Sequence, residues 1–247
     1  MAGVGVVVAV LAGVQDAGDG PEGGFGDLDV HGGLPAGLVP KYFQVERTGG
    51  GKTATASVPA AHVRANGWLV DIIDPKRRSY LDRKTGLDVL TNVSGIPVHT
   101  DIESMMWALK ELFLSMLGVN IAIGERNAWP GAFPARLLVI DEFGTFAGMA
   151  ARMHRRAGGT GPSPALDQRR QIEWQGRQAG HRLVVAVHQP NLRLFGDSDS
   201  RGQYGYRLIT GAYTSSLWRM TFGFGPGSNG TPGSKDAAWS ASAKPPA

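Results

Sequence analysis

Hydrophobic residues come in short runs through the middle of the chain, and most of these runs end in polar residues. Four runs predict β-strands: YFQV (42–45), GWLVDIID (67–74), RLLVIDE (136–142) and RLVVAVHQ (182–189). The last three are apolar almost throughout, as expected for strands buried on both faces of a sheet. Their polar ends should gather at the carboxyl edge of that sheet, where open α/β sheets bind ligands.

Helical spacing of apolar residues separates these strands. The clearest case is Asp101 to Leu117, where apolar positions repeat on one face, Thr100 and Glu103 match a capping box, and Gly118 predicts the end of the helix. A second helix is predicted to start at Ser163-Pro164 and to end before Gly180. The alternation predicts an α/β fold with a mostly parallel sheet flanked by helices.

Composition divides the chain into three parts. Residues 1–40 form an acidic, Gly-rich leader that is predicted to be partly disordered. The α/β domain comprises residues 41–223. Residues 224–247 form a Gly/Pro/Ser/Ala-rich tail that is predicted to be disordered. The apolar run 4–14 is too short for a bilayer, which needs roughly 20 residues, so no membrane span and a cytoplasmic location are expected.

Residue usage excludes several kinds of chemistry. The 247 residues include no cysteine, so disulfides and thiolate metal sites are impossible. The six histidines lack a chelating spacing, and no GxSxG nucleophile turn occurs.

Charge is unevenly distributed. Residues 1–40 contain five acids and no Lys or Arg, whereas residues 151–182 contain seven arginines and two acids. Such a basic region suits a polyanion, although a solvated helical face explains the charge equally well.

The stretch TGGGKT, Thr48 to Thr53, follows the first predicted strand. Backbone N–H groups of Gly49, Gly50 and Gly51 can surround phosphate oxygens, while Lys52 would reach the β/γ-phosphates and Thr53 would bind Mg²⁺. Two features count against this interpretation. Glu46 stands where the usual pattern has its first glycine, and Pro59 is expected to interrupt the following helix. The stretch alone fits a nucleotide site or a structural turn.

Two further strand ends carry candidate chemistry. After RLLVI, Asp141 could hold the Mg²⁺ shell of a nucleotide and Glu142 could deprotonate the attacking water. After VVAV, His188-Gln189 could touch the γ-phosphate. Either end could also be a strand that simply reaches solvent.

In order, these pieces resemble the motor domain of FtsK/SpoIIIE-type DNA translocases, especially the actinobacterial TraB-like and phage versions. The matching stretches, from about Tyr42 to Phe222, are RTGGGKT, DIIDPKRRSY, IPVHTDIESMMWALKEL, RLLVIDEFGTF, QGRQAGHRLVVAVHQP and RGQYGYRLITG. The DPK marker is the most specific of them. The resemblance implies a RecA-like P-loop NTPase fold and a homo-oligomer, usually a hexameric ring, around double-stranded DNA. ATP and Mg²⁺ would be bound between subunits.

The resemblance also implies residue roles. Lys52 and Thr53 take the Walker A positions, Asp141 and Glu142 the Walker B positions, and Gln189 that of a γ-phosphate sensor. Arg177, with Arg201 or Arg207, is a candidate for reaching a neighbour's nucleotide, although Arg177 also fits a helix C-terminal cation. The stretch ARMHRRAGGTGPSP (151–164) would grip the DNA backbone from a mobile loop, unless it is merely a basic insertion.

The departures at Glu46 and Pro59, and the low-complexity sequence after Phe222, leave a rival interpretation. The chain could be a degenerate, non-hydrolysing ring subunit or a DNA-binding remnant of such a motor. A packaging or secretion ATPase is a second rival.

Overall fold

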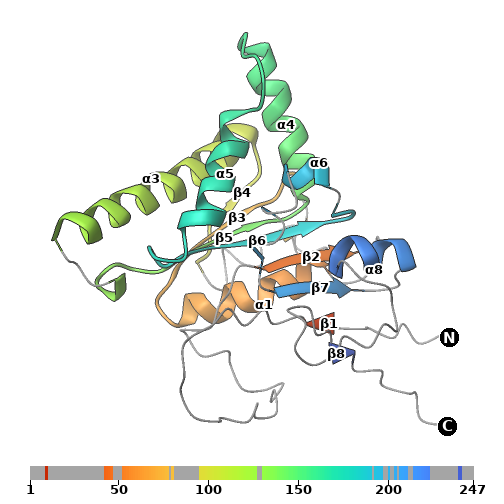
Figure 1. Cartoon of the computed structure of the whole chain (residues 1–247), viewed down its shortest axis with the longest axis horizontal. Coiled ribbons are helices and arrows are strands. Elements are labelled where there is room, and N and C mark those ends of the chain that lie inside the picture. Colours follow the sequence, from red (N-terminus) through yellow and green to blue (C-terminus); the bar gives the residue numbers. More distant parts are fainter. Residues whose placement is uncertain are drawn as a thin grey trace.

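The computed structural model describes residues 9–10, 42–46, 52–77, 79–80, 95–126, 130–190, 192–196, 200, 203–204, 206–210, 214–222 and 239–240. Its centre is a parallel sheet of six strands in the order β4-β3-β5-β6-β2-β7 (Figure 1). In chain order these strands are β2 (Tyr42–Glu46), β3 (Leu69–Ile73), β4 (Val98–His99), β5 (Arg136–Ile140), β6 (His181–Val187) and β7 (Tyr206–Thr210). The predicted α/β class with a mostly parallel sheet is confirmed.

Helices cover both faces of the sheet. The helices are α1 (Lys52–Ala65), α3 (Ile102–Arg126), α4 (Phe143–Arg156), α5 (Pro164–Gln175), α6 (Leu192–Phe195) and α8 (Ser215–Phe222), with a 3₁₀ turn at Pro130–Ala132. Alternate residues of β5 divide between the two layers. Leu138 and Ile140 pack with α3, α4 and α5, whereas Leu137 and Val139 pack with α1. This period of two explains why the strand is apolar at every position from Leu137 to Ile140.

Helix α1 shows that the predicted interruption at Pro59 was wrong. The helix runs from Lys52 to Ala65 with Pro59 inside it. Proline removes one backbone donor, but Ala56, Ala60 and Val63 are buried against the sheet on either side of it. Tertiary packing therefore outweighs the local propensity.

The predicted stop of α3 at Gly118 was also wrong, since the helix continues to Arg126. Beyond Gly118 the buried Val119 and the partly buried Ile123 continue the apolar face, so packing again carries the helix onward. At its start, the Asp101 carboxylate accepts the Ser104 backbone N–H at 2.9 Å, so Asp101 supplies the cap.

Helix α3 is apolar over most of its length. Of the helices in the described residues, it alone, over Ile102–Glu125, is long and apolar enough to cross a membrane by length and composition. Core helices can meet the same criterion, and Met105, Leu109, Leu112 and Met116 are buried in the core. The apolar face of α3, including Met105 and Met116, is therefore a packing surface.

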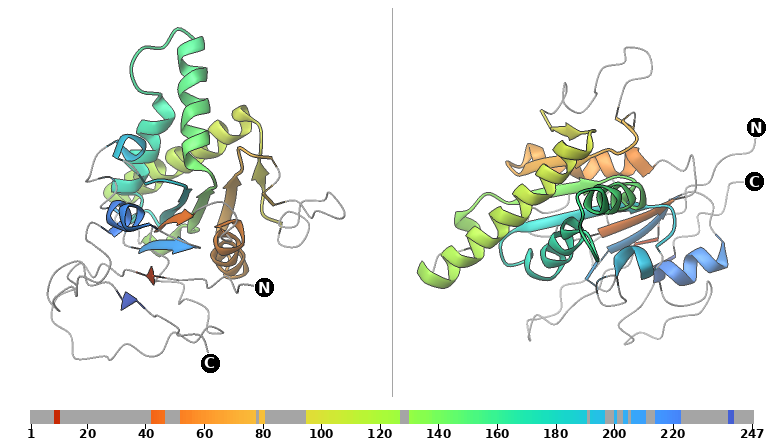
Figure 2. Two further views of the ribbon diagram at one scale, coloured as in Figure 1. Left: turned by 90° about the vertical axis from the view of Figure 1, so that its right-hand side faces the viewer. Right: turned by 90° about the horizontal axis from the view of Figure 1, so that it is seen from above.

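Helix α4 differs from the sequence interpretation of 151–164 as a mobile basic loop. Residues 151–156 belong to α4, and the loop to α5 comprises only 157–163. This helical hairpin projects away from the sheet (Figures 1 and 2). Arg152, Arg155 and Arg156 are exposed near its tip.

Arg169 does not belong to an exposed basic surface. Its side chain is buried on α5, where it pairs with the buried Glu173 and donates to the Phe195 carbonyl at 2.9 Å. It also lies 4.7 Å above the Phe143 ring. Tyr204 donates to the same Glu173, and burial beside that carboxylate raises the tyrosine pKa well above its ordinary value. This network ties α4, α5 and the segment after β6 together.

The chain ends contribute a second pairing. Ala9–Val10 (β1) and Trp239–Ser240 (β8) form an antiparallel pair. The remainder of 1–40 and 224–247 lies outside the described residues, so the predicted domain boundaries remain predictions.

His181, the first residue of β6, is buried in a polar arrangement. Its Nδ1 lies 2.7 Å from the Ala179 carbonyl, which can only accept, and its Nε2 lies 2.9 Å from the Ser115 hydroxyl. Nδ1 therefore carries the proton in the neutral ring, and Ser115 donates to Nε2. Burial lowers the pKa of His181 below its ordinary 6.5, assisted by the charges of Arg136 and Arg182.

This depressed pKa predicts a loss of stability in acid. Above pH 6.5 the contribution is fully present. As the pH falls below 6.5, the unfolded chain takes up the proton first, and the free energy of unfolding falls by at most about 1.4 kcal/mol per pH unit from this group. Urea unfolding at pH 7.5 and 5.5 should show a smaller pH difference for His181→Gln than for wild type. Equal pH differences in the two proteins would refute the assignment.

Candidate nucleotide-binding site

The carboxyl ends of the central strands bring the candidate residues together. Asp74 follows β3, Asp141 follows β5 and His188 follows β6, while Lys52 starts α1 after β2 and the loop. Because β3, β5, β6 and β2 are neighbours and parallel, all four ends open onto one edge of the sheet (Figure 1). The ligand edge predicted from the sequence is therefore present in the fold.

Thr53 and Asp141 meet at this edge although they are 88 residues apart. The Thr53 hydroxyl donates to Oδ2 of Asp141 at 3.1 Å, and Asp141 is buried. Oδ1 of Asp141 accepts the Glu142 backbone N–H at 2.9 Å. A hydroxyl and a carboxylate side by side form the hard, oxygen-only donor set that Mg²⁺ prefers, so these two residues fit the predicted metal.

Glu142 is held from several sides. It has a left-handed backbone (φ 51°, ψ 49°) at the N-cap of α4, and its side chain is only 5% exposed. Its Oε1 accepts Lys76 Nζ at 2.6 Å and lies 2.8 Å from His188 Nε2. Both contacts were missed from the sequence, although the DPK motif and the HQ strand end pointed to these two segments.

Asp74 organises the turn that carries Lys76. Its buried carboxylate accepts the Lys76 N–H at 3.0 Å, the Ser79 N–H at 2.8 Å and the Ser79 hydroxyl at 3.0 Å. Within this turn Arg77 also has a left-handed backbone (φ 63°), and its Nε donates to the Thr100 carbonyl at 3.2 Å. Asp74 therefore acts on the structure of the loop, and Lys76 is the residue of the turn that reaches Glu142.

Gln189 and Glu142 line the same pocket at this edge of the sheet. An open pocket of about 450 Å³ is lined by both residues, by His188, and by residues of α4 and α6 (Gly144, Thr145, Ala147, Gly148 and Leu194). The Gln189 side chain is exposed there.

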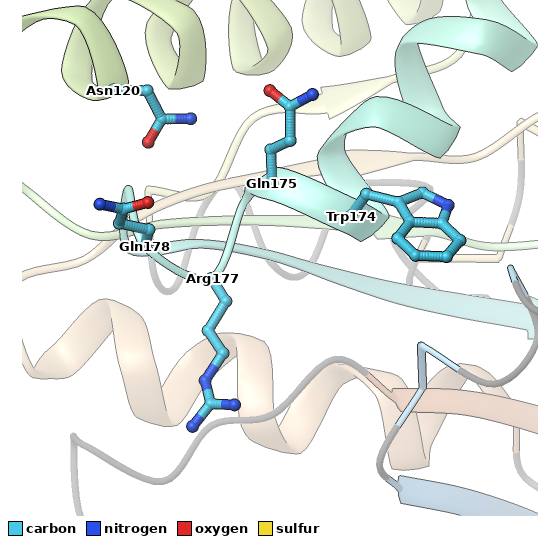
Figure 3. A pocket seen from close by; sticks show the side chains of 5 residues that line it. All are labelled: Asn120, Trp174, Gln175, Arg177 and Gln178. Atoms are coloured by element: carbon cyan, nitrogen blue, oxygen red, sulfur yellow. The ribbon is translucent and has the colours of Figure 1, made fainter. Parts of the chain in front are cut away.

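Arg177 lies away from this group. It follows α5 and precedes β6, so it sits at the amino edge of the sheet, opposite the strand ends that carry Thr53 and Glu142. There it lines a larger pocket of about 710 Å³ with Asn120, Trp174, Gln175 and Gln178. Figure 3 shows its exposed side chain extending away from Asn120 and Trp174. Arg177 is thus not brought to the site of its own chain.

The remaining predicted residues divide into two groups. Arg207 on β7 donates to the Thr221 carbonyl at 3.1 Å, near the end of α8, so it has a structural contact within the chain. Thr48, Gly49, Gly50, Gly51 and Arg201, with the side chain of Lys52, lie outside the described residues, as does the side chain of Glu46.

A parallel sheet, a helix that begins within the TGGGKT stretch, and a threonine bonded to the acid after a buried strand together define an α/β P-loop fold of the RecA-like class. Comparisons with known proteins agree with this class. No family model matches the chain. It is 27% identical, over 189 residues, to the FtsK domain-containing protein YdcQ of Bacillus subtilis (strain 168), a match that covers 75% of this chain and 37% of YdcQ.

Solved structures share the fold at low identity. The pCW3 conjugation coupling protein TcpA, in its monomer form with ATPγS, matches with a TM-score of 0.56 and 14% identity, over 74% of this chain and 52% of TcpA. EssC (ATPases 2 and 3) of Geobacillus thermodenitrificans matches with a TM-score of 0.52 and 13% identity, over 76% of this chain and 35% of EssC. The resemblance to FtsK/SpoIIIE-type motor ATPases is confirmed, and the chain spans from about a third to about half the length of these proteins.

The Asp74 turn makes a stability prediction. Asp74→Ala should lower the free energy of unfolding by about 2–4 kcal/mol, because three donors lose a buried charged acceptor. Asp167→Ala removes the exposed partner of Arg170, 3.2 Å away, and should cost less than about 1 kcal/mol. Denaturant unfolding of both variants measures the difference, and an Asp74→Ala protein as stable as Asp167→Ala would contradict this role.

Proposed function

We propose that this chain is an ATP-dependent motor that translocates double-stranded DNA. The observation that carries the proposal is the Thr53–Asp141 hydrogen bond with Glu142 immediately beside it. This is the arrangement that a P-loop ATPase needs at the carboxyl edge of its sheet. The sequence likeness to an FtsK domain-containing protein and the fold likeness to a conjugation coupling protein support the same class of motor.

The residue roles follow from position. Backbone groups of Thr48, Gly49, Gly50 and Gly51, with Lys52, bind the ATP phosphates. Thr53 and Asp141 would hold Mg²⁺, which when bound neutralises charge on the phosphates.

Glu142 takes a proton from the attacking water, whose oxygen bonds to the γ-phosphorus. The bond from that phosphorus to the bridging oxygen breaks, and ADP leaves with the electron pair. Gln189, exposed in the same pocket, senses the γ-phosphate.

Arginines from a second copy complete the site in this proposal. Arg177 is exposed at the edge opposite its own nucleotide site, a position suited to acting on a neighbouring subunit. Arg201 and Arg207 remain further candidates for this role. The proposed assembly is a homo-oligomeric ring, hexameric by the family resemblance, in the cytoplasm, with recruitment to the membrane left to a partner.

The projecting tip of α4 is the proposed DNA contact. Three arginines are exposed near this tip: Arg152, Arg155 and Arg156. Arg169, in contrast, is buried. The Arg182 guanidinium donates to backbone carbonyls, among them the Arg177 carbonyl at 3.1 Å from its Nη1. Of the basic region 151–182, the tip residues are therefore best placed to meet phosphates, and such contacts carry no base sequence information.

The first rival is a degenerate subunit or DNA-binding remnant that does not hydrolyse ATP. Glu46 in the loop favours this rival, because a carboxylate near a phosphate group repels it.

The second rival is a secretion motor, since the fold is also shared with the type VII secretion ATPase EccC of Thermomonospora curvata (TM-score 0.51, 13% identity, 74% of this chain and 22% of EccC). DNA stimulation of the ATPase separates the DNA motor from the secretion motor.

ATP turnover should depend on Glu142 but ATP binding should not. Glu142→Gln should lower kcat at least about 100-fold, the usual loss for a general base, while calorimetric ATP affinity stays near wild type. Lys52→Ala should lose ATP affinity. If wild type and Lys52→Ala give the same empty binding traces, the degenerate-subunit rival is favoured, and Glu46→Gly then tests whether the loop carboxylate is responsible.

The α4 tip should govern the salt dependence of DNA binding. Replacing Arg152, Arg155 and Arg156 together by alanine should reduce the slope of log K against log salt by roughly 2–3, about 0.9 for each lost phosphate contact. Arg219→Ala, at an exposed arginine on α8, is the matched control and should leave the slope unchanged. Long duplex DNA at two salt concentrations is the ligand, and a slope that survives the triple substitution would place the DNA elsewhere.

A further inference from the structure

Lys76 and His188 converge on one oxygen of Glu142 from the two strands that flank β5. Lys76 follows β3 and His188 follows β6, and both reach Oε1, at 2.6 Å and 2.8 Å. The carboxylate is almost fully buried, whereas Lys76 is 50% exposed. A carboxylate that receives donors from both neighbouring strands has its orientation defined by the sheet itself.

Each partner of the Lys76–Glu142 pair lies at or next to a residue with a left-handed backbone conformation. Among the described residues outside glycine, only Arg77 and Glu142 have a positive φ, 63° and 51°. One follows Lys76 directly, and the other is its partner. Such conformations cost free energy and persist where surrounding contacts impose them, most often at functional sites.

The surrounding contacts are present on the Lys76 side. Asp74 accepts the Lys76 N–H and both donors of Ser79, and Arg77 is tied to the Thr100 carbonyl. A lysine needed only for solubility would not require a buried carboxylate to shape its turn. The turn therefore presents the Lys76 ammonium group to Glu142 in a defined position.

We infer that Lys76 is a positioning residue that holds the Glu142 carboxylate in the orientation from which it accepts the proton of the attacking water. The inference rests on the proposed ATPase function. Lys76 acts through Glu142, and His188 provides the second donor to the same oxygen. A charged hydrogen bond of this kind restricts a side chain that would otherwise rotate among several conformers, and misplacement of a general base lowers the rate of the chemical step.

The test is a kinetic double-mutant cycle with long duplex DNA present. Lys76→Met should lower kcat about 10–100-fold with KM and ATP affinity near wild type, because the contact bears on the chemical step. Lys76→Arg, which keeps a donor and a positive charge, should recover part of the rate. In the Glu142→Gln background, Lys76→Met should have no further effect. Lys110→Met, at an exposed lysine on α3, is the control and should behave as wild type.

The outcomes separate this inference from the proposed function. A wild-type protein with no ATPase activity refutes the function and with it the role of Lys76. An active wild type whose Lys76→Met variant turns over normally refutes only the inference. A Lys76→Met variant faster than wild type also overturns it, because the pair would then restrain Glu142. Thermal unfolding of the same four cycle proteins without nucleotide gives a second readout, and strictly additive shifts in Tm would show that the pair is not coupled.

Discussion

The parallel pairing of β5 with β3 and β6 is the constraint on which the rest of the structure depends. Because the three strands run in one direction, the residues that follow them, Asp74, Asp141 and His188, must emerge at the same edge. Burial on both faces keeps the strands apolar, so polar chemistry is confined to their ends. The Lys76–Glu142 contact, 66 residues apart in sequence, is a consequence of that arrangement. The Thr53–Asp141 contact, 88 residues apart, also requires the parallel pairing of β2 with β6, which brings the start of α1 to the same edge.

Much of the fold was predictable because its signals are local. The apolar runs ending at Asp74, Glu142 and Gln189, and the helix start at Ser163-Pro164, all appear as expected. The short β4, β7 and helix α4 were not predicted as elements, since β4 has only two residues and α4 continues into a stretch whose Gly/Pro-rich end suggested a loop. The errors at Pro59 and Gly118 share one cause: breaker residues were judged by intrinsic propensity, while buried neighbours such as Ala60 and Val119 keep both helices intact.

For the candidate site, the sequence predicted the main residues but not the contacts between them. Motif spacing identified Thr53, Asp141 and Glu142, because a phosphate loop and an acidic strand end have recognisable sequence patterns. It could not identify Lys76 and His188 as partners of Glu142, because that contact depends on the strand order, which is a tertiary property. Composition likewise counted Arg169 among the basic residues, although packing against Phe143 and Glu173 removes it from the surface.

Helix α4 joins two places that were described separately. Glu142 occupies the N-cap position at its start, and the exposed Arg155 and Arg156 lie in its last turn. Its 14 residues span roughly 21 Å at 1.5 Å per residue, without a proline to bend them. The ring of Phe143, the first residue of α4, packs against the Arg169 guanidinium in a cation–π contact. In the proposed DNA motor, α4 would act as a rigid lever that pivots at the Glu142 carboxylate. A tilt of about 10° at the pivot would carry the basic tip through roughly 4 Å, slightly more than the ~3.4 Å rise of one DNA base pair.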